Sequence, residues 1–135
     1  MSSSGAAEKV KDFYQMIMTD TEAAIARYVS ADIVWENPLP EGIPFGGRYE
    51  GVEGLVSYLT QLAGEIEMSP LNFTEIIADE DKAAAIGIEQ NTLVISTGKS
   101  YTMPFVHVLK FNQDGKINYV YEYNVTSDMV KAFSN

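Results

Sequence analysis

The chain has 135 residues, enough for one folded domain and too few for two. It contains no cysteine, which excludes disulfides, thiolate nucleophiles and cysteine-ligated metal sites. Nineteen acidic residues against nine basic ones give a formal net charge of −10, so neither nucleic acid nor an anionic membrane surface is an expected partner. No apolar run approaches the roughly 18 residues that span a bilayer. We therefore expect a cytoplasmic protein.

The first half of the chain is expected to be mainly helical. Residues 1–5 are polar and are expected to form a flexible tail in front of a single domain over residues 6–135. The spacing of apolar residues and the capping residues then predict the elements in order: helices over residues 6–18 and 22–28, a short strand over residues 33–35, an irregular connection rich in glycine and proline over residues 37–51, and a third helix from residue 52 to about residue 66.

The second half of the chain is expected to be a run of strands. Alternating apolar residues and turn sequences predict strands over residues 71–78, 83–95, 100–111 and 116–125, followed by a short helical turn over residues 127–133. Helices gathered at the start and an antiparallel meander at the end are typical of the α+β class. Long strands that curve around amphipathic helices predict a cone with a ligand pocket at its open end.

The most informative polar pair is predicted on the last two long strands. Alternation places Tyr101, Met103, Phe105, His107 and Leu109 on one face of their strand. If the Asp-Gly turn pairs Gln113 with Lys116, the single histidine, His107, lies directly across from Glu122 on the next strand. A glutamate beside an imidazole raises the imidazole pKa and fixes its tautomer, so the pair is a candidate for proton transfer.

Structural interpretations of the same residues stay open at this stage. A buried histidine bonded to a neighbouring acid is often only a satisfied core group, and a tryptophan such as Trp35 is usually core. With one histidine and no cysteine, a zinc site is not expected. Tyr119, Tyr121 and Tyr123 form a row on the opposite face of the last strand, where they are expected to pack against a helix or a second subunit.

A family resemblance is carried by two segments of the chain. The first is Phe45-Gly46-Gly47-Arg48-Tyr49-Glu50-Gly51-Val52-Glu53-Gly54-Leu55, which follows Trp35-Glu36-Asn37-Pro38, and the second is the final hairpin over residues 108–117. Together they resemble the SnoaL-like and ketosteroid-isomerase-like branch of the nuclear transport factor 2 superfamily, over nearly the whole chain. The resemblance implies a cone-shaped, cystatin-like α+β barrel, with N-terminal helices packed on a strongly curved, mixed and mostly antiparallel sheet. Sheet-face homodimers are common in that family. The superfold hosts many unrelated reactions, so it implies the fold more strongly than the chemistry.

Carried over residue by residue, the resemblance implies specific roles. The isomerases place a general-base aspartate before a proline after the first strand, where this chain has Asn37, which cannot abstract a proton. Their oxyanion tyrosine matches Phe13 or the adjacent Tyr14, and their protonated aspartate matches His107. SnoaL-like cyclases use pocket histidine and acid residues of the last strands, which here are His107 and Glu122.

These observations lead to one expected function with two alternatives. We expect a cofactor-independent isomerase, cyclase or dehydratase-type lyase that acts on an apolar or polycyclic oxygenated molecule. The expected catalytic residues are His107, Glu122 and Asn37, and the expected ligand-binding residues are Tyr14, Trp35, Tyr58, Tyr101, Met103, Phe105 and Asn124. The alternatives are a ligand-binding protein without chemistry and an assembly module that dimerises through its sheet face.

Overall fold

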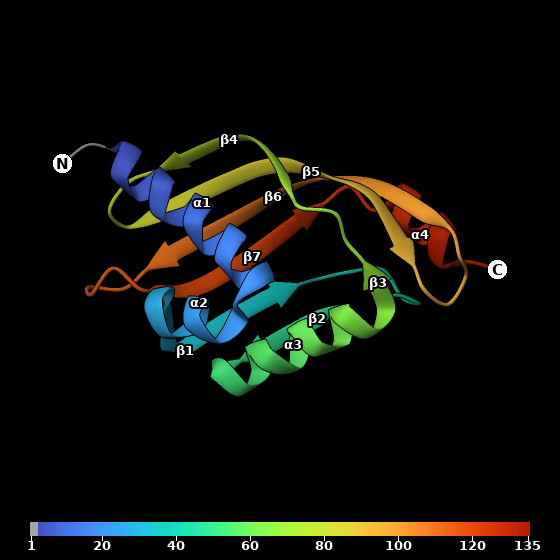
Figure 1. The fold of residues 1–135 in the computed structure, drawn as a ribbon, viewed down its shortest axis with the longest axis horizontal. Coiled ribbons are helices and arrows are strands. Elements are labelled where there is room, and N and C mark those ends of the chain that lie inside the picture. Colours follow the sequence, from blue (N-terminus) through green and yellow to red (C-terminus); the bar gives the residue numbers. More distant parts are fainter. Residues whose placement is uncertain (1–2) are drawn as a thin grey trace.

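The computed structural model describes residues 3–135 and contains a curved sheet covered by helices on one side (Figure 1). The elements follow in the order α1 (Ser3–Thr19), α2 (Thr21–Tyr28), β1 (Val29–Asn37), β2 (Gly47–Glu50), α3 (Gly51–Glu65), β3 (Ile66–Glu67), β4 (Asn72–Ala78), β5 (Lys82–Val94), β6 (Ser100–Phe111), β7 (Ile117–Asn124) and α4 (Ser127–Phe133). The fold is therefore the expected α+β arrangement of N-terminal helices on a strongly curved, mixed sheet.

The sheet is antiparallel except at one point. Its strands lie in the order β2-β1-β7-β6-β5-β3, and β4 also pairs with β5. β1 runs parallel to β7, which brings the first strand of the chain beside the last. α1 packs against β4 and β5, α3 against β1 and β2, and α4 against β6 near one end of the sheet (Figure 1). The inner face of the sheet and the helices thus enclose the core.

Several boundaries differ from those predicted by the sequence. α1 begins at Ser3, so residues 3–5 of the expected tail are helical, while residues 1 and 2 lie outside the described part of the chain. The connection over residues 37–51 ends in a strand, β2, which the sequence did not predict because the segment is rich in glycine. Its pairing with β1, from Asn37 opposite Gly47 to Val34 opposite Glu50, is a long-range contact that local propensity does not reveal.

Small residues on β5 make room inside the sheet for the aromatic residues of β6. Ala83, Ala85 and Gly87 face inward in alternation, opposite the larger Leu109, His107 and Phe105. At Gly87 an added Cβ would lie 2.5 Å from the Asn72 carbonyl oxygen and 2.8 Å from the Phe105 ring. The backbone oxygen cannot move aside without disturbing the β4–β5 ladder.

Gly87→Ala is therefore expected to destabilise the protein by about 1–3 kcal/mol, because overpacking forces neighbouring atoms to shift. Gly64→Ala is the matched control, since Gly64 lies in α3 with no atom near an added Cβ. Removing a helical glycine there is expected to stabilise the protein by roughly 0.5–1 kcal/mol. Urea unfolding measures both changes, and equal stability of the two variants would contradict the crowding at Gly87.

Candidate active site

The pairing of β6 with β7 brings the two predicted proton-transfer residues together. His107 lies directly opposite Glu122 in the ladder, as the sequence predicts, and both side chains are buried. The premise of that prediction is wrong, however, because the turn closes by a hydrogen bond from the Asn112 N–H to the Lys116 carbonyl oxygen. An irregularity after Lys110 changes the register by one residue and restores the expected pairing along the rest of the hairpin.

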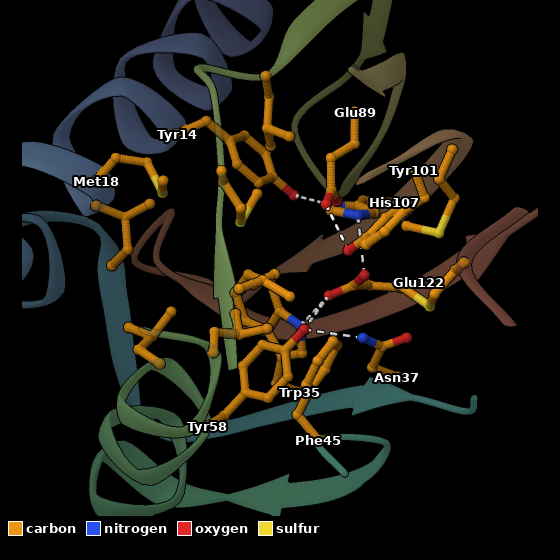
Figure 2. Close-up of a pocket in the computed structure, with 18 residues that line it drawn as sticks. Tyr14, Met18, Trp35, Asn37, Phe45, Tyr58, Glu89, Tyr101, His107 and Glu122 are labelled. Carbon is orange, nitrogen blue, oxygen red and sulfur yellow. Dashed lines mark hydrogen bonds and ion pairs between the residues drawn. The ribbon is translucent and has the colours of Figure 1, made fainter. Parts of the chain in front are cut away.

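Both ring nitrogens of His107 are engaged by other side chains. Nδ1 lies 2.8 Å from the hydroxyl oxygen of Tyr14 on α1, and Nε2 lies 3.2 Å from Oε1 of Glu122 (Figure 2). Whenever the imidazole is neutral, Nε2–H can donate to the carboxylate while Nδ1 accepts from the Tyr14 hydroxyl. Tyr14, His107 and Glu122 then form one continuous chain of hydrogen bonds from α1 to β7.

The second oxygen of Glu122 receives two further hydrogen bonds. The Trp35 indole N–H and the Tyr58 hydroxyl each donate to Oε2 at 2.8 Å. Burial by itself would raise the pKa of Glu122, but the charge and hydrogen bond of His107 and these two donors outweigh it and lower the pKa to about 2. Glu122 is therefore an ionised carboxylate in the interior. Its charge adds to the effect of burial in raising the pKa of Tyr58 and Tyr14 well above the ordinary value, so both hydroxyls stay protonated.

Asn37 and Asn124 extend this network away from the histidine. The Asn37 amide nitrogen donates to the Tyr58 hydroxyl oxygen at 2.9 Å, and its carbonyl oxygen accepts from the Asn124 amide at 2.9 Å. The Asn124 amide also lies 3.3 Å from Oε1 of Glu122. Asn37 thus holds Tyr58, which is itself a donor to the buried carboxylate.

The network faces a small, mostly apolar cavity beneath the helices (Figure 2). Its volume is about 60 Å³, well below the roughly 150 Å³ of a protein cavity that holds benzene. A molecule of a few heavy atoms fits this space, and a polycyclic molecule does not fit it without movement of the walls. The lining residues are Tyr14, Ile17, Met18, Trp35, Asn37, Phe45, Tyr58, Leu59, Leu62, Ile66, Met68, Leu71, Glu89, Tyr101, Met103, His107, Glu122 and Met129.

Most of the predicted site residues line this cavity, and two do not. The three predicted catalytic residues do, together with the predicted ligand-binding residues Tyr14, Trp35, Tyr58, Tyr101 and Met103. Phe105 instead packs against the His107 ring, with ring centroids 4.6 Å apart. Asn124 does not line the cavity but is hydrogen-bonded to two residues that do, Asn37 and Glu122. Phe105 and Asn124 both border a separate groove on the outside of the sheet.

Residues 10–120 match the model of the SnoaL-like domain. The chain belongs to the SnoaL-like domain family. No curated protein shows significant similarity to this SnoaL-like domain.

Solved structures repeat the fold at low sequence identity. An NTF2-like protein from Burkholderia xenovorans is 21% identical, with 99% of each chain covered and a TM-score of 0.84. A protein from Mesorhizobium loti, whose name proposes a SnoaL-like polyketide cyclase, is 21% identical over 91% of this chain and 99% of that one, with a TM-score of 0.70. A Catenulispora acidiphila protein with a ketosteroid-isomerase-like fold, in complex with trimethylamine, is 13% identical over 93% and 92%, with a TM-score of 0.72.

One polar residue of this SnoaL-like domain's cavity, Glu89 on β5, is not among the residues that the sequence predicts for the site. Its side chain is buried and accepts hydrogen bonds from Tyr101 and Thr92. The signal was present in the strand pattern, because Ala83, Ala85 and Gly87 face inward and the next position of that alternation is Glu89. Within residues 3–135 there is no cluster of three potential metal ligands and no helix long and apolar enough to span a membrane.

Proposed function

We propose that this SnoaL-like domain binds a small, apolar, oxygenated molecule and moves a proton on it without a cofactor, as an isomerase, cyclase or dehydratase-type lyase. One observation carries the proposal: the buried carboxyl group of Glu122 is linked through His107 to the hydroxyl of Tyr14, which lines an apolar cavity. Maintaining a carboxylate in such a place is costly unless it is fully hydrogen-bonded, and Glu122 is. The trimethylamine in the Catenulispora acidiphila structure supports a ligand of comparable size.

In this proposal Glu122 orients and stabilises the histidine and does not itself take the proton. Its two oxygens are already occupied by four donors, and a carboxylate with a pKa near 2 is a weak base at neutral pH. His107 is the base, held with Nδ1 free to accept by its Nε2–H bond to Glu122. The carboxylate stabilises the imidazolium that forms, as the acid does in other histidine-acid pairs.

Tyr14 connects His107 to the ligand. As the Tyr14 oxygen takes a proton from a carbon of the ligand, its own hydrogen passes to Nδ1 of His107. The tyrosine stays neutral throughout, which matters because burial opposes the tyrosinate. Asn37 completes the arrangement by holding the Tyr58 hydroxyl at the opposite side of the carboxylate.

A small ketone in deuterated water tests the function without knowledge of the natural substrate. Acetone has few heavy atoms and acidic α-hydrogens, so an acid–base site of this size is expected to exchange those hydrogens for deuterium faster than buffer does. Proton NMR follows the loss of the methyl signal, and amide shifts of the labelled protein follow binding. Loss of the enhancement in His107→Ala supports the assignment, and an unchanged rate in that variant rejects it.

Binding without chemistry is the second candidate, and the saturation of Glu122 by protein donors favours it. In the same experiment this function gives shifts of amides around the cavity with no exchange above the buffer rate. The absence of both amide shifts and deuterium exchange would contradict both candidates for small carbonyl compounds.

We also propose that the outer face of the sheet forms a homodimer. Tyr119, Tyr121 and Tyr123 stack along this face, Tyr123 is 57% exposed, and Val125 beside it is 58% exposed. Tyr123→Glu would place like charges near each other in a symmetric dimer and is expected to give monomers by light scattering. Thr60→Glu on α3 is the control expected to leave the dimer intact, and a monomeric unaltered protein at high concentration would contradict the proposal.

A further inference from the structure

Glu89 is a second buried carboxyl in the cavity, held in place by an irregularity in β5. The regular pairing of β5 with β6 is interrupted between Glu89 and Thr92, and Asn91 in this interval has a φ of 52°. A non-glycine residue in the left-handed region costs free energy and is retained where the surrounding structure demands it. The irregularity turns Thr92 inward beside Glu89, where their side chains form a hydrogen bond of 2.7 Å.

The two oxygens of Glu89 have different environments. Both hydrogen bonds, from the Thr92 hydroxyl and from the Tyr101 hydroxyl at 2.8 Å, end on Oε2. This is the pattern of a carboxylic acid whose carbonyl oxygen accepts from the protein and whose O–H remains for another partner. The side chain lines the cavity and points toward the region of His107 and Tyr14 (Figure 2). Within residues 3–135, the ion pairs of the structure do not include Glu89.

We propose that Glu89 is the proton donor of the site, a carboxylic acid that donates through Oε1 to the oxygen of a carbonyl, hydroxyl or epoxide ligand while the Tyr14–His107–Glu122 relay takes a proton from carbon. The proposal rests on the proposed function and extends it by naming the acid and the ligand group that it binds. The irregularity in β5 then serves to place Thr92 beside Glu89, where its hydroxyl holds the carboxyl group in the cavity.

The electrostatic surroundings support a division between the two carboxyls. Burial raises the pKa of Glu89; the hydrogen bonds from Thr92 and Tyr101 oppose that rise, the Glu122 charge adds to it, and His107 opposes it. The pKa of Glu122 is lowered instead. Environments that drive two pKa values apart suit two carboxyls to different roles, here Glu89 as the acid and Glu122 as the ionised partner of the histidine that accepts the proton.

The proton and electron balance closes without a co-reactant. With a ketone, the relay removes an α-hydrogen as a proton, and the C–H electron pair becomes the carbon–carbon double bond. The carbonyl π electrons move to the oxygen, which takes the Oε1 proton of Glu89. The product is an enol, with Glu89 as carboxylate and His107 as imidazolium, and the reverse steps restore both.

Infrared spectroscopy tests this role directly with acetone labelled with ¹³C at its carbonyl as the probe. Just above the ordinary glutamate pKa of 4.5, the unaltered protein is expected to show the C=O band of a buried protonated carboxyl. Saturating acetone is expected to shift that band and to move the labelled ketone band to lower wavenumber. Glu89→Gln is expected to lose the carboxyl band and the additional ketone shift, whereas Glu53→Gln, at an exposed position on α3, keeps both.

The outcomes separate this proposal from the proposed function. A buried carboxyl band that survives in Glu89→Gln, no such band above the ordinary glutamate pKa, or the same ketone band in both proteins would overturn the role of Glu89. Ketone shifts that depend on Glu89, without deuterium exchange by the unaltered protein, would support Glu89 as the donor and overturn the catalytic function instead.

Discussion

Glu122→Gln is expected to lower deuterium exchange of a small ketone by roughly 10²–10⁴-fold, the range typical for the loss of a general acid–base function. Glutamine preserves the shape of the side chain but carries no charge, so the imidazolium of His107 loses its neutralising partner. The amide can also present an N–H to Nε2, which favours the tautomer with the hydrogen on Nδ1. In that tautomer Nδ1 cannot accept the Tyr14 hydrogen, and the relay stops at its first step.

A control variant and a stability measurement show whether a loss of exchange is specific to Glu122. Glu53→Gln removes a carboxylate from an exposed position on α3 and is expected to leave exchange unchanged. Unfolding of Glu122→Gln by urea, measured at the pH of the assay, shows whether the variant is folded when its rate is recorded. A folded Glu122→Gln protein that exchanges at the unaltered rate would remove Glu122 from the mechanism.

The second large effect is a loss of stability in acid that depends on Glu122. The folded-state pKa of about 2 lies below the ordinary value of 4.5, so the folded protein binds fewer protons here than the unfolded chain between these two values. The stabilisation is fully present above about pH 4.5 and is lost as the pH falls toward 2. A shift of this size corresponds to about 3 kcal/mol.

Urea unfolding between pH 2 and 6 measures this effect in the unaltered protein and in Glu122→Gln. The stability difference between the two proteins is expected to shrink by about 3 kcal/mol as the pH falls through this range. Glu89→Gln is the informative control because the folded-state pKa of Glu89 is raised. Glu89 therefore favours the folded state below its ordinary pKa and loses that contribution as the pH rises, so its removal steepens the acid loss. A pH-independent difference between the unaltered protein and Glu122→Gln would contradict the lowered pKa.

The strand pattern was sufficient to predict that His107 lies opposite Glu122, and for a physical reason. Side chains alternate along a strand, and a hairpin fixes the register of its two strands within one residue. The prediction nevertheless succeeded through compensation, since the assumed turn pairing was wrong and an irregularity after Lys110 restored the register. The residues that lie on other elements could be placed only as general pocket lining.

Composition and periodicity by themselves determined that this protein is acidic and of the α+β class, and they predicted the facing of His107 and Glu122 that the structure contains. The tertiary structure decided the rest. It showed that Tyr14, Trp35 and Tyr58, from α1, β1 and α3, converge on that pair, and that the cavity is small. It also brought Glu89 into the cavity. Local sequence records which face a side chain occupies on its own element, whereas the distance between elements depends on packing across the whole core.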